Sequence, residues 1–164
     1  MVAVELRDIV TEADRVAVLA LGVAPGQDAF VASVETSFQD AIDDARACPR
    51  MWSVTADDRT VGFVMISDGI PAERLASDDD LIGPYYLWRL LIDRNEQGKG
   101  YGTAALDAVV AYLTGRPDAE VLWTTAGQGP GSPQAFYERY GFVATGALKW
   151  GEAVLRLDLR EAAR

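Results

Sequence analysis

The stretch "DRNEQGKGYGTAALDAVVAYL" (residues 93–113) places three glycines within five positions and then continues as a helix-like pattern. Gly98, Gly100 and Gly102 lack a Cβ atom, so the turn can adopt positive φ angles and direct several backbone N–H groups toward a ligand. A helix that begins near Thr103 adds its unpaired N–H groups and the positive end of its dipole. The combination predicts an anion site suited to phosphate.

Several glycine-rich turns share this physics, so the surrounding sequence has to decide among them. The P-loop pattern GxxxxGK[ST] is absent, because Lys99 lies between two glycines and no Ser or Thr follows it. The dinucleotide pattern GxGxxA matches at Gly100, Gly102 and Ala105, but a loop separates it from the preceding strand, and Glu120 lies at the start of the next strand rather than at its far end. Nucleotide hydrolysis and NAD or FAD binding are therefore disfavoured. A tight turn without a ligand is the remaining alternative.

The overall composition narrows the class of protein. The chain has 164 residues, of which 49% are hydrophobic, and this suits one compact domain over 1–164. Lys plus Arg is 15 against 25 Asp plus Glu, a formal net charge of -10 that repels phosphate backbones and favours cations. Nucleic acid is disfavoured as a partner and an aminated substrate is favoured, although such a charge can also serve only to keep a protein soluble.

The chain has no histidine and one cysteine, Cys48. Catalysis by Ser-His-Asp or Cys-His groups is therefore impossible, and no zinc site of the ordinary type can be assembled, so we expect no metal. The apolar runs are far shorter than the roughly 18 residues of a membrane span, and "MVAVELRDIV" lacks a basic region followed by an apolar stretch. We expect a cytoplasmic protein without a membrane partner.

The hydrophobic pattern predicts the order strand, two helices, three strands, helix, strand, helix, two strands. This order is a mixed sheet with helices packed on it, in the α/β or α+β sense. The second helix is expected over about residues 27 to 47, with Phe30, Val34, Phe38 and Ile42 along one stripe.

Three further segments bear on the site. The stretch "YYLWRLLID" (85–93) is apolar on both alternating faces and predicts a central strand covered on both sides. The polar stretch before it (68–84) is broken by Gly and Pro and predicts a long loop of the kind that often carries function. Near the C-terminus, Ser132 is expected to cap a short helix with Pro133 at its first position and Gly141 just past its end.

A third glycine pattern, Q-x-x-G-x-G, matches at Gln97, Gly100 and Gly102, and here the chain resembles the GNAT superfamily of N-acetyltransferases, whose pyrophosphate-binding loop has this sequence. A second motif, "SPQAFYERYGFVATG" (132–146), looks like the family's C-terminal helix and strand, in which FYxxxGF packs beside the thiol end of coenzyme A. The resemblance covers almost the whole chain. It implies the GNAT fold, a mixed and mostly antiparallel sheet of six to seven strands, splayed between strands 4 and 5 and flanked by about four helices.

Within that superfamily, four segments look like bacterial diamine or spermine/spermidine N-acetyltransferases, namely "VAPGQDAFVASV", "VGFVMI", "YYLWRLLIDRNEQGKGYG" and "GEAVLRLDL". The resemblance implies acetyl-CoA as the donor and a small-molecule primary amine, a polyamine or diamine such as spermidine, as the acceptor. An aminoglycoside, an amino acid or a protein amine as acceptor, and a non-catalytic acyl-CoA-binding relative, are the alternatives. Dimers are frequent in the family, so a homodimer is a further expectation.

The resemblance also implies site residues. The pantetheine arm of the donor would pair with the backbone of Leu90, Leu91 and Ile92, and the backbone N–H near Leu91 would stabilise the oxyanion. Tyr137 stands where the family carries its general-acid tyrosine, and a phenol of pKa about 10 can protonate a thiolate whose thiol has a pKa of about 8.5, slightly uphill. The other expected cofactor-binding residues are Gln97, Gly98, Lys99, Gly100, Tyr101, Gly102, Thr103, Ser132 and Phe136.

Helix geometry supports the same role for Tyr137. Phe136 and Tyr140 share an i, i+4 stripe typical of a core face, whereas Tyr137 points about 100° away. A packed aromatic ring with a tethered hydroxyl is the alternative.

The acceptor amine raises a separate question, because a primary amine of pKa about 10 is neutral in only about one molecule per thousand at pH 7. Either the site selects that fraction or a base removes the proton through water, and without histidine the candidate bases are carboxylates. We expect Glu35, Asp79 and Glu152 to bind the acceptor. They represent a larger acidic set on the second helix, in the "SDDD" loop and near the last strand, namely Glu35, Asp40, Asp43, Asp44, Asp78, Asp79, Asp80 and Glu152. Each can equally be a solvated surface acid or one that steers cations inward.

Overall fold

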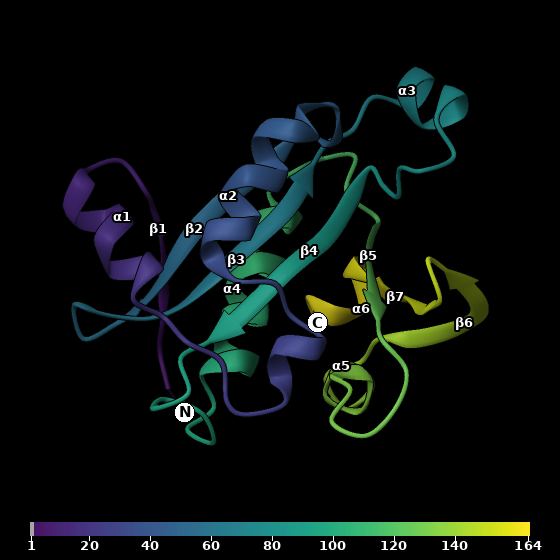
Figure 1. Ribbon diagram of the computed structural model, residues 1–164. Coiled ribbons are helices and arrows are strands. Elements are labelled where there is room, and N and C mark those ends of the chain that lie inside the picture. Colours follow the sequence, from purple (N-terminus) through teal and green to yellow (C-terminus); the bar gives the residue numbers. More distant parts are fainter. Residues whose placement is uncertain (1) are drawn as a thin grey trace.

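The structure is a computed structural model that describes residues 2–164, and it contains one seven-stranded sheet in the order β1-β2-β3-β4-β5-β7-β6 (Figure 1). The strands are β1 (Glu5–Asp8), β2 (Pro49–Ala56), β3 (Arg59–Asp68), β4 (Tyr85–Ile92), β5 (Val121–Ala126), β6 (Val143–Lys149) and β7 (Glu152–Asp158). The helices are α1 (Glu12–Leu19), α2 (Val34–Asp43), α3 (Ala72–Ser77), α4 (Tyr101–Thr114), α5 (Gln134–Tyr140) and α6 (Leu159–Ala162), with the 3-10 helices η1 (Gln27–Ala29) and η2 (Ala45–Ala47). Only β4 and β5 are parallel among the paired strands of this described part of the chain. The predicted mixed and mostly antiparallel sheet is confirmed.

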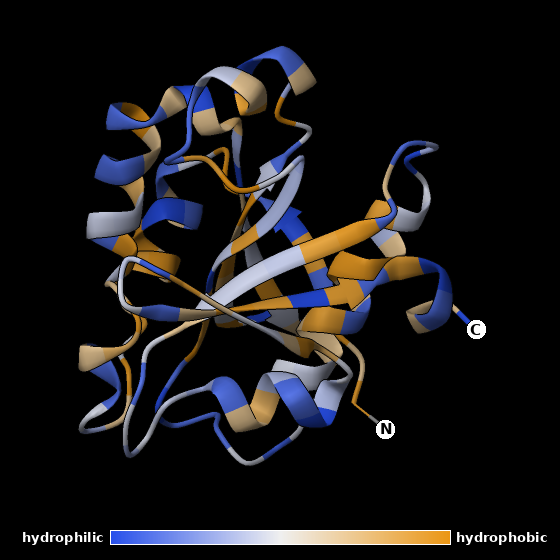
Figure 2. Ribbon diagram, turned by 90° about the vertical axis from the view of Figure 1, so that its right-hand side faces the viewer, coloured by the Kyte–Doolittle hydropathy of each residue, from blue (hydrophilic) through white to orange (hydrophobic). Residues whose placement is uncertain are grey.

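Helices cover both faces of the sheet, with α1 and α2 in front of β2 to β4 and α4 behind them (Figure 1). The side chains of β3 alternate between the two layers, as the pleat requires. Phe63 and Met65 join the core under α1 and α2, whereas Val64 and Ile66 join the larger core with α4. Figure 2 shows hydrophobic residues gathered along the central strands. No helix in residues 2–164 is both long and apolar enough to cross a membrane.

Strand β4 lies between β3 and β5, which confirms the predicted central strand. It pairs with β3 along its whole length, but with β5 only at Tyr86↔Trp123 and Leu87↔Thr124. Beyond Leu87 the two strands diverge (Figure 1), and no other strand within residues 2–164 pairs with this edge of β4. The predicted splay is confirmed, and the open backbone edge needs other hydrogen-bond partners.

The prediction of one helix over 27–47 is wrong, because the chain forms η1, an extended break and then α2 and η2. Ser33 is extended and its hydroxyl accepts a hydrogen bond from the N–H of Thr36 at 3.1 Å, so it is the N-cap of a new helix. The predicted stripe therefore loses its register after the break, and Ile42 is 72% exposed. Phe30 belongs instead to the loop that follows η1.

Two smaller boundaries also differ from the predictions. The polar stretch 68–84 is not wholly a loop, since it contains α3. Ser132 is not the N-cap of the last site helix, because Pro133 occupies that position and α5 begins at Gln134. The Ser132 hydroxyl still accepts a hydrogen bond from the N–H of Gln134 at 3.2 Å.

Candidate active site

The glycine-rich turn connects the end of β4 to the start of α4. Gly98 and Gly100 have φ angles of 75° and 87°, which only glycine adopts at little cost. Gly100 is the N-cap of α4, so the 14-residue helix begins at Tyr101 and not near Thr103. The free N–H groups and the positive dipole end of α4 therefore lie at the turn itself.

Gln97 holds this turn in place. Its side-chain Nε2 donates to the carbonyl of Ile92 at 3.0 Å and to Oε1 of Gln27 at 2.8 Å. The amide thus ties the turn both to the end of β4 and to η1. In this structure the glutamine of the Q-x-x-G-x-G motif positions the loop.

Gly102 has a different role, because it lies inside the first turn of α4 with an ordinary helical φ angle. A Cβ atom there would lie 3.2 Å from Cζ of Phe136 on α5. Glycine therefore allows α5 to pack closely against the start of α4.

A cavity of about 460 Å³ opens beside the turn, and we call it the anion cavity. It contains most of the residues predicted to bind the donor, namely Leu90, Ile92, Gln97, Gly98, Gly100, Tyr101, Gly102, Thr103, Ser132, Phe136 and Tyr137. Two predicted residues are not among its lining side chains. Lys99 is 53% exposed and pairs with Glu96 at 2.9 Å. Leu91 packs its side chain into the core under α1 and α2. Its backbone N–H and carbonyl face β3, because Asp93 two residues later donates its N–H to the Val61 carbonyl in the same antiparallel ladder, so the open edge of β4 is formed by Leu90 and Ile92.

Seven residues that line the anion cavity were not among those predicted to bind the donor, namely Gln27, Phe30, Val31, Glu96, Gly131, Pro133 and Arg139. Gln27, Phe30 and Val31 come from η1 and the loop after it, which the prediction of one continuous helix had hidden. Arg139 comes from α5 and adds a cation beside the anion site. It lies two residues after Tyr137, within the recognised motif, and its charge was the available signal.

A second cavity of about 360 Å³ lies next to the first, and we call it the bridging cavity. It shares Phe30, Val31, Leu90, Pro133 and Tyr137 with the anion cavity. Its other walls include two residues of β5, Thr124, which is the last to pair with β4, and Thr125, which lies just beyond that pairing. The bridging cavity is therefore the place where a ligand in the anion cavity could meet a second ligand.

Tyr137 lies on the wall between these two cavities. It is the buried residue of α5, 7% exposed, whereas Phe136 and Tyr140 are only partly buried. The predicted core stripe of α5 is therefore wrong, because a helix of seven residues gives too few positions to fix its buried face. Burial raises the pKa of the Tyr137 hydroxyl well above its usual value, so this phenol is protonated at neutral pH.

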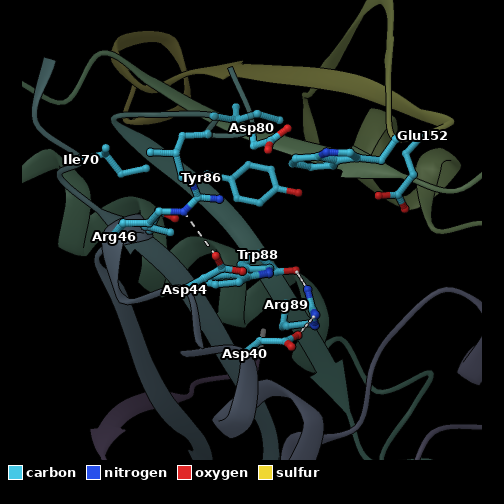
Figure 3. Close-up of a pocket in the computed structure, with 14 residues that line it drawn as sticks. Asp40, Asp44, Arg46, Ile70, Asp80, Tyr86, Trp88, Arg89 and Glu152 are labelled. Carbon is cyan, nitrogen blue, oxygen red and sulfur yellow. Dashed lines mark hydrogen bonds and ion pairs between the residues drawn. The ribbon is translucent and has the colours of Figure 1, made fainter. Parts of the chain in front are cut away.

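A third cavity of about 270 Å³, the acidic cavity, lies beyond the bridging cavity (Figure 3). The two share Tyr86, Trp88, Arg89 and Glu152. Its charged lining groups are four carboxylates, Asp40, Asp44, Asp80 and Glu152, and two guanidinium groups, Arg46 and Arg89. Trp150 adds an aromatic wall from the turn between β6 and β7.

Ion pairs neutralise part of this charge. Arg89 pairs with Asp40 at 2.7 Å, and Arg46 pairs with Asp44 at 3.3 Å. Within residues 2–164, neither Asp80 nor Glu152 forms an ion pair. The cavity therefore keeps a net negative charge, and its aromatic walls suit an organic cation.

The three acids predicted to bind the acceptor lie in different places. Glu152 lines both the bridging and the acidic cavity. Asp79 is exposed and lies outside the lining, where its carbonyl accepts a hydrogen bond from Lys149, while its neighbour Asp80 lines the acidic cavity. Glu35 lies about 140° around α2 from Asp40 and faces a separate groove beside α1.

The splayed sheet, its open edge and the glycine turn at a helix N-terminus are the features that the resemblance to N-acetyltransferases predicts. A family model described as the acetyltransferase (GNAT) family matches residues 26–142, well over half of the chain. The chain therefore belongs to the GNAT family and is an acetyltransferase.

Curated relatives agree with this class. The chain is 28% identical over 151 residues to the probable spermine N(1)-acetyltransferase of Bacillus subtilis subsp. natto (strain BEST195), with 92% of this chain and 95% of that protein covered. The spermine/spermidine N(1)-acetyltransferase of Bacillus subtilis (strain 168) matches with the same identity and coverage.

Solved structures show the same fold at lower identity. An aminoglycoside acetyltransferase, AAC(6')-Ib in complex with coenzyme A, has a TM-score of 0.72 at 19% identity, with 99% of this chain and 96% of that chain covered. An acetyltransferase from Thermus thermophilus has a TM-score of 0.63 at 24% identity, with 95% of this chain and 97% of that chain covered. These likenesses are evidence for the fold and not for the acceptor.

Proposed function

We propose that this acetyltransferase transfers the acetyl group of acetyl-CoA to a primary amine of a polyamine or diamine such as spermidine. The observation that carries this proposal is the acidic cavity, which joins the bridging cavity through shared walls and keeps a net negative charge. The names of the two relatives at 28% identity support the same acceptor class.

The donor would lie across the first two cavities. Its pyrophosphate fits the backbone N–H groups of the turn from Gly98 to Gly102 and the N-terminus of α4, with Arg139 as an added cation. Its pantetheine amides would satisfy the open backbone edge of β4 at Leu90 and Ile92, the neighbours of Leu91, and an N–H group of that edge would then face the developing oxyanion. The thioester would therefore reach the bridging cavity beside Tyr137.

Tyr137 would protonate the departing thiolate. Its burial raises the pKa of the phenol and so makes it a weaker acid in the free protein. The departing sulfur would be buried in the same place, and desolvation raises the proton affinity of a thiolate in the same direction. The free energy of the proton transfer then depends on the difference between the pKa values of the Tyr137 phenol and the thiol of coenzyme A, which share one environment.

The acceptor would enter through the acidic cavity. Asp80 and Glu152 are the lining carboxylates without an ion pair, so they are available to an ammonium group. Trp88 and Trp150 offer aromatic faces, which attract organic cations by about 0.5–2 kcal/mol. A linear chain with several ammonium groups matches these features better than a neutral or anionic acceptor does.

The test is a thiol-release assay with acetyl-CoA against spermidine, spermine, diamines of increasing length, aminoglycosides, lysine and a lysine peptide. We expect the highest kcat/KM with a polyamine or diamine. A higher kcat/KM for an aminoglycoside, an amino acid or the peptide would overturn the proposed acceptor class. Binding of acetyl-CoA with no amine-stimulated release would contradict the proposed reaction of this chain.

The homodimer stays a prediction with its own measurement. Strand β6 forms one edge of the sheet and exposes Val143 and Leu148 by 65% and 67%. Sedimentation velocity would show a species of twice the chain mass if the prediction is right and a single monomer if it is wrong.

A further inference from the structure

Three side chains on the wall of the bridging cavity form a continuous hydrogen-bonded chain. The Tyr86 hydroxyl lies 2.7 Å from Oγ1 of Thr125, and Oγ1 of Thr125 donates to Oε1 of Glu152 at 3.1 Å. A threonine hydroxyl carries one proton. Because that proton is directed at Glu152, Tyr86 is the donor in its bond to Thr125. The chain therefore runs in one direction, from Tyr86 to the carboxylate.

The position of these three hydrogen-bonded side chains in the fold matters as much as the direction of their hydrogen bonds. Tyr86, Thr125 and Glu152 come from β4, β5 and β7, which are neighbours in the sheet, and Tyr86 sits just before β4 and β5 separate. All three side chains line the bridging cavity, as does Tyr137. In Figure 3 the Tyr86 ring reaches across the cavity with its hydroxyl toward the side of Glu152. The oxygen of Tyr86 keeps lone pairs that can accept a hydrogen bond from a bound amine.

Acetyl transfer needs a group of this kind, because an amine enters mostly as an ammonium ion and attacks only when neutral. We propose that Tyr86, Thr125 and Glu152 form a proton relay that deprotonates the bound amine. This inference rests on amine acetylation, and it goes beyond the proposed function because it does not depend on which amine is the acceptor.

Every proton and bond of the acetyl transfer is accounted for in this relay. One ammonium proton passes to the Tyr86 oxygen while the Tyr86 proton passes to Thr125 and the Thr125 proton passes to Glu152. The freed nitrogen lone pair forms the C–N bond with the thioester carbon, and the C–S bond breaks as Tyr137 protonates the sulfur. The second nitrogen proton restores the Tyr137 hydroxyl, and Glu152 releases its proton to solvent.

Burial explains why protons move along the chain together and not through a free phenolate. Desolvation raises the pKa of Tyr86 to about 12. A phenolate at Tyr86 would therefore be costly at neutral pH. The Tyr86 proton has to leave while the ammonium proton arrives, and only a chain that ends on a carboxylate allows this.

The decisive variant is Thr125→Val, which breaks the relay without changing any charge. Four carboxylates and two guanidinium groups face Glu152 across the two cavities, Asp28, Asp40, Asp44, Asp80, Arg46 and Arg89, and this variant keeps all of them. We expect kcat at pH 7 to fall by about 10²- to 10⁴-fold, the usual contribution of a general base, with the KM for the amine nearly unchanged. Thr125→Ser restores the hydroxyl and should restore kcat to within about threefold of the native value.

The pH profile gives a second readout that a merely structural role would not move. Without the relay both forms of the amine bind but only the neutral fraction reacts, so kcat/KM of Thr125→Val should rise about tenfold per pH unit up to the amine pKa of about 10. The native protein should rise less steeply over the same range. Tyr86→Phe and Glu152→Gln should share the steep profile, and Thr145→Val, which removes an exposed hydroxyl bonded to the Val154 carbonyl, should behave like the native protein.

Two outcomes would overturn the relay. One is a native kcat in Thr125→Val, and the other is an equal loss in Thr125→Ser and Thr125→Val when both proteins keep the native melting temperature. The assay uses whichever amine of the panel has the highest kcat/KM. A wrong acceptor class therefore overturns only the proposed acceptor and leaves this test in place.

Discussion

The anion cavity and the acidic cavity differ in the kind of atom that builds them. Half of the residues that line the anion cavity form one continuous segment, from β4 through the glycine turn into α4, and a ligand at this segment would meet backbone N–H groups. The acidic cavity gathers side chains from α2, η2, the segment before β4, β4 itself and the turn before β7. A site made of backbone constrains the local sequence strongly. A site made of scattered side chains leaves little trace in any one segment.

The largest effect is expected at Tyr137, on the wall between the anion cavity and the bridging cavity. Tyr137→Phe removes the proposed acid while keeping the ring, so kcat should fall by about 10²- to 10⁴-fold with an unchanged Kd for acetyl-CoA. Tyr140→Phe is the matched control, because it removes a hydroxyl from the same helix that only bonds Asp107 at 2.8 Å. Steady-state kinetics and calorimetric binding measure both quantities. Equal kcat values in the two variants would remove Tyr137 from the mechanism.

A smaller effect tests the anion cavity, where the donor would meet backbone N–H groups. Gly100→Ala forces a Cβ atom into a left-handed conformation that costs about 1–2 kcal/mol, and relaxation of the turn should weaken acetyl-CoA binding by about 5- to 30-fold. Gly146→Ala carries a similar backbone strain, with φ of 83° against 87°, but lies on β6, where the added Cβ would meet open space, whereas at Gly100 it would lie 3.3 Å from Cγ2 of Val2. Both variants should lose similar stability, and only Gly100→Ala should lose affinity. Equal affinities would show that the turn does not hold the donor.

In the acidic cavity, where side chains would bind the acceptor, a single substitution should have a weaker effect on the KM. Asp80→Asn should raise the KM for a polyamine by about two- to fivefold, the usual size of an exposed charge pair. Asp79→Asn is the control, since it makes the same change one residue earlier and outside the acidic cavity. Titration of each variant with spermidine measures the difference. A larger KM increase in Asp79→Asn would place the acceptor outside this cavity.

The smallest effect concerns the helix that carries Asp40. Ser33→Ala removes the N-cap hydroxyl of α2 and should cost about 1 kcal/mol of folding free energy, or about 2–4 °C in Tm. Ser77→Ala changes an exposed serine at the end of α3 and should cost less than about 0.5 kcal/mol. Thermal unfolding followed by circular dichroism compares them. Identical melting temperatures would mean that the cap is not what separates α2 from η1.

These differences explain which parts of the fold and of the candidate site could be predicted from the sequence alone. Strand β4 follows from local periodicity, the glycine turn follows from its composition, and most of the anion cavity follows from the family resemblance that two motifs carry. The break at Ser33 could not be predicted from the apolar spacing, because that spacing continues across it. Asp79 and Asp80 are adjacent carboxylates in a polar segment that has no hydrophobic periodicity. Only the fold decides which of the two lines the acidic cavity. The face of α5 that carries Tyr137 is fixed by packing and not by its short stripe.

The contact between Lys149 and the carbonyl of Asp79 has a consequence for divergence and engineering. It joins the end of β6, directly before the turn that carries Trp150, to the segment before β4. That turn and that segment both line the acidic cavity, and both are connections outside the sheet. Such connections tolerate changes in length and composition that strands do not. Exchanging the two as a matched pair between homologues would offer a route to new acceptor preferences while the donor half of the enzyme stays as it is.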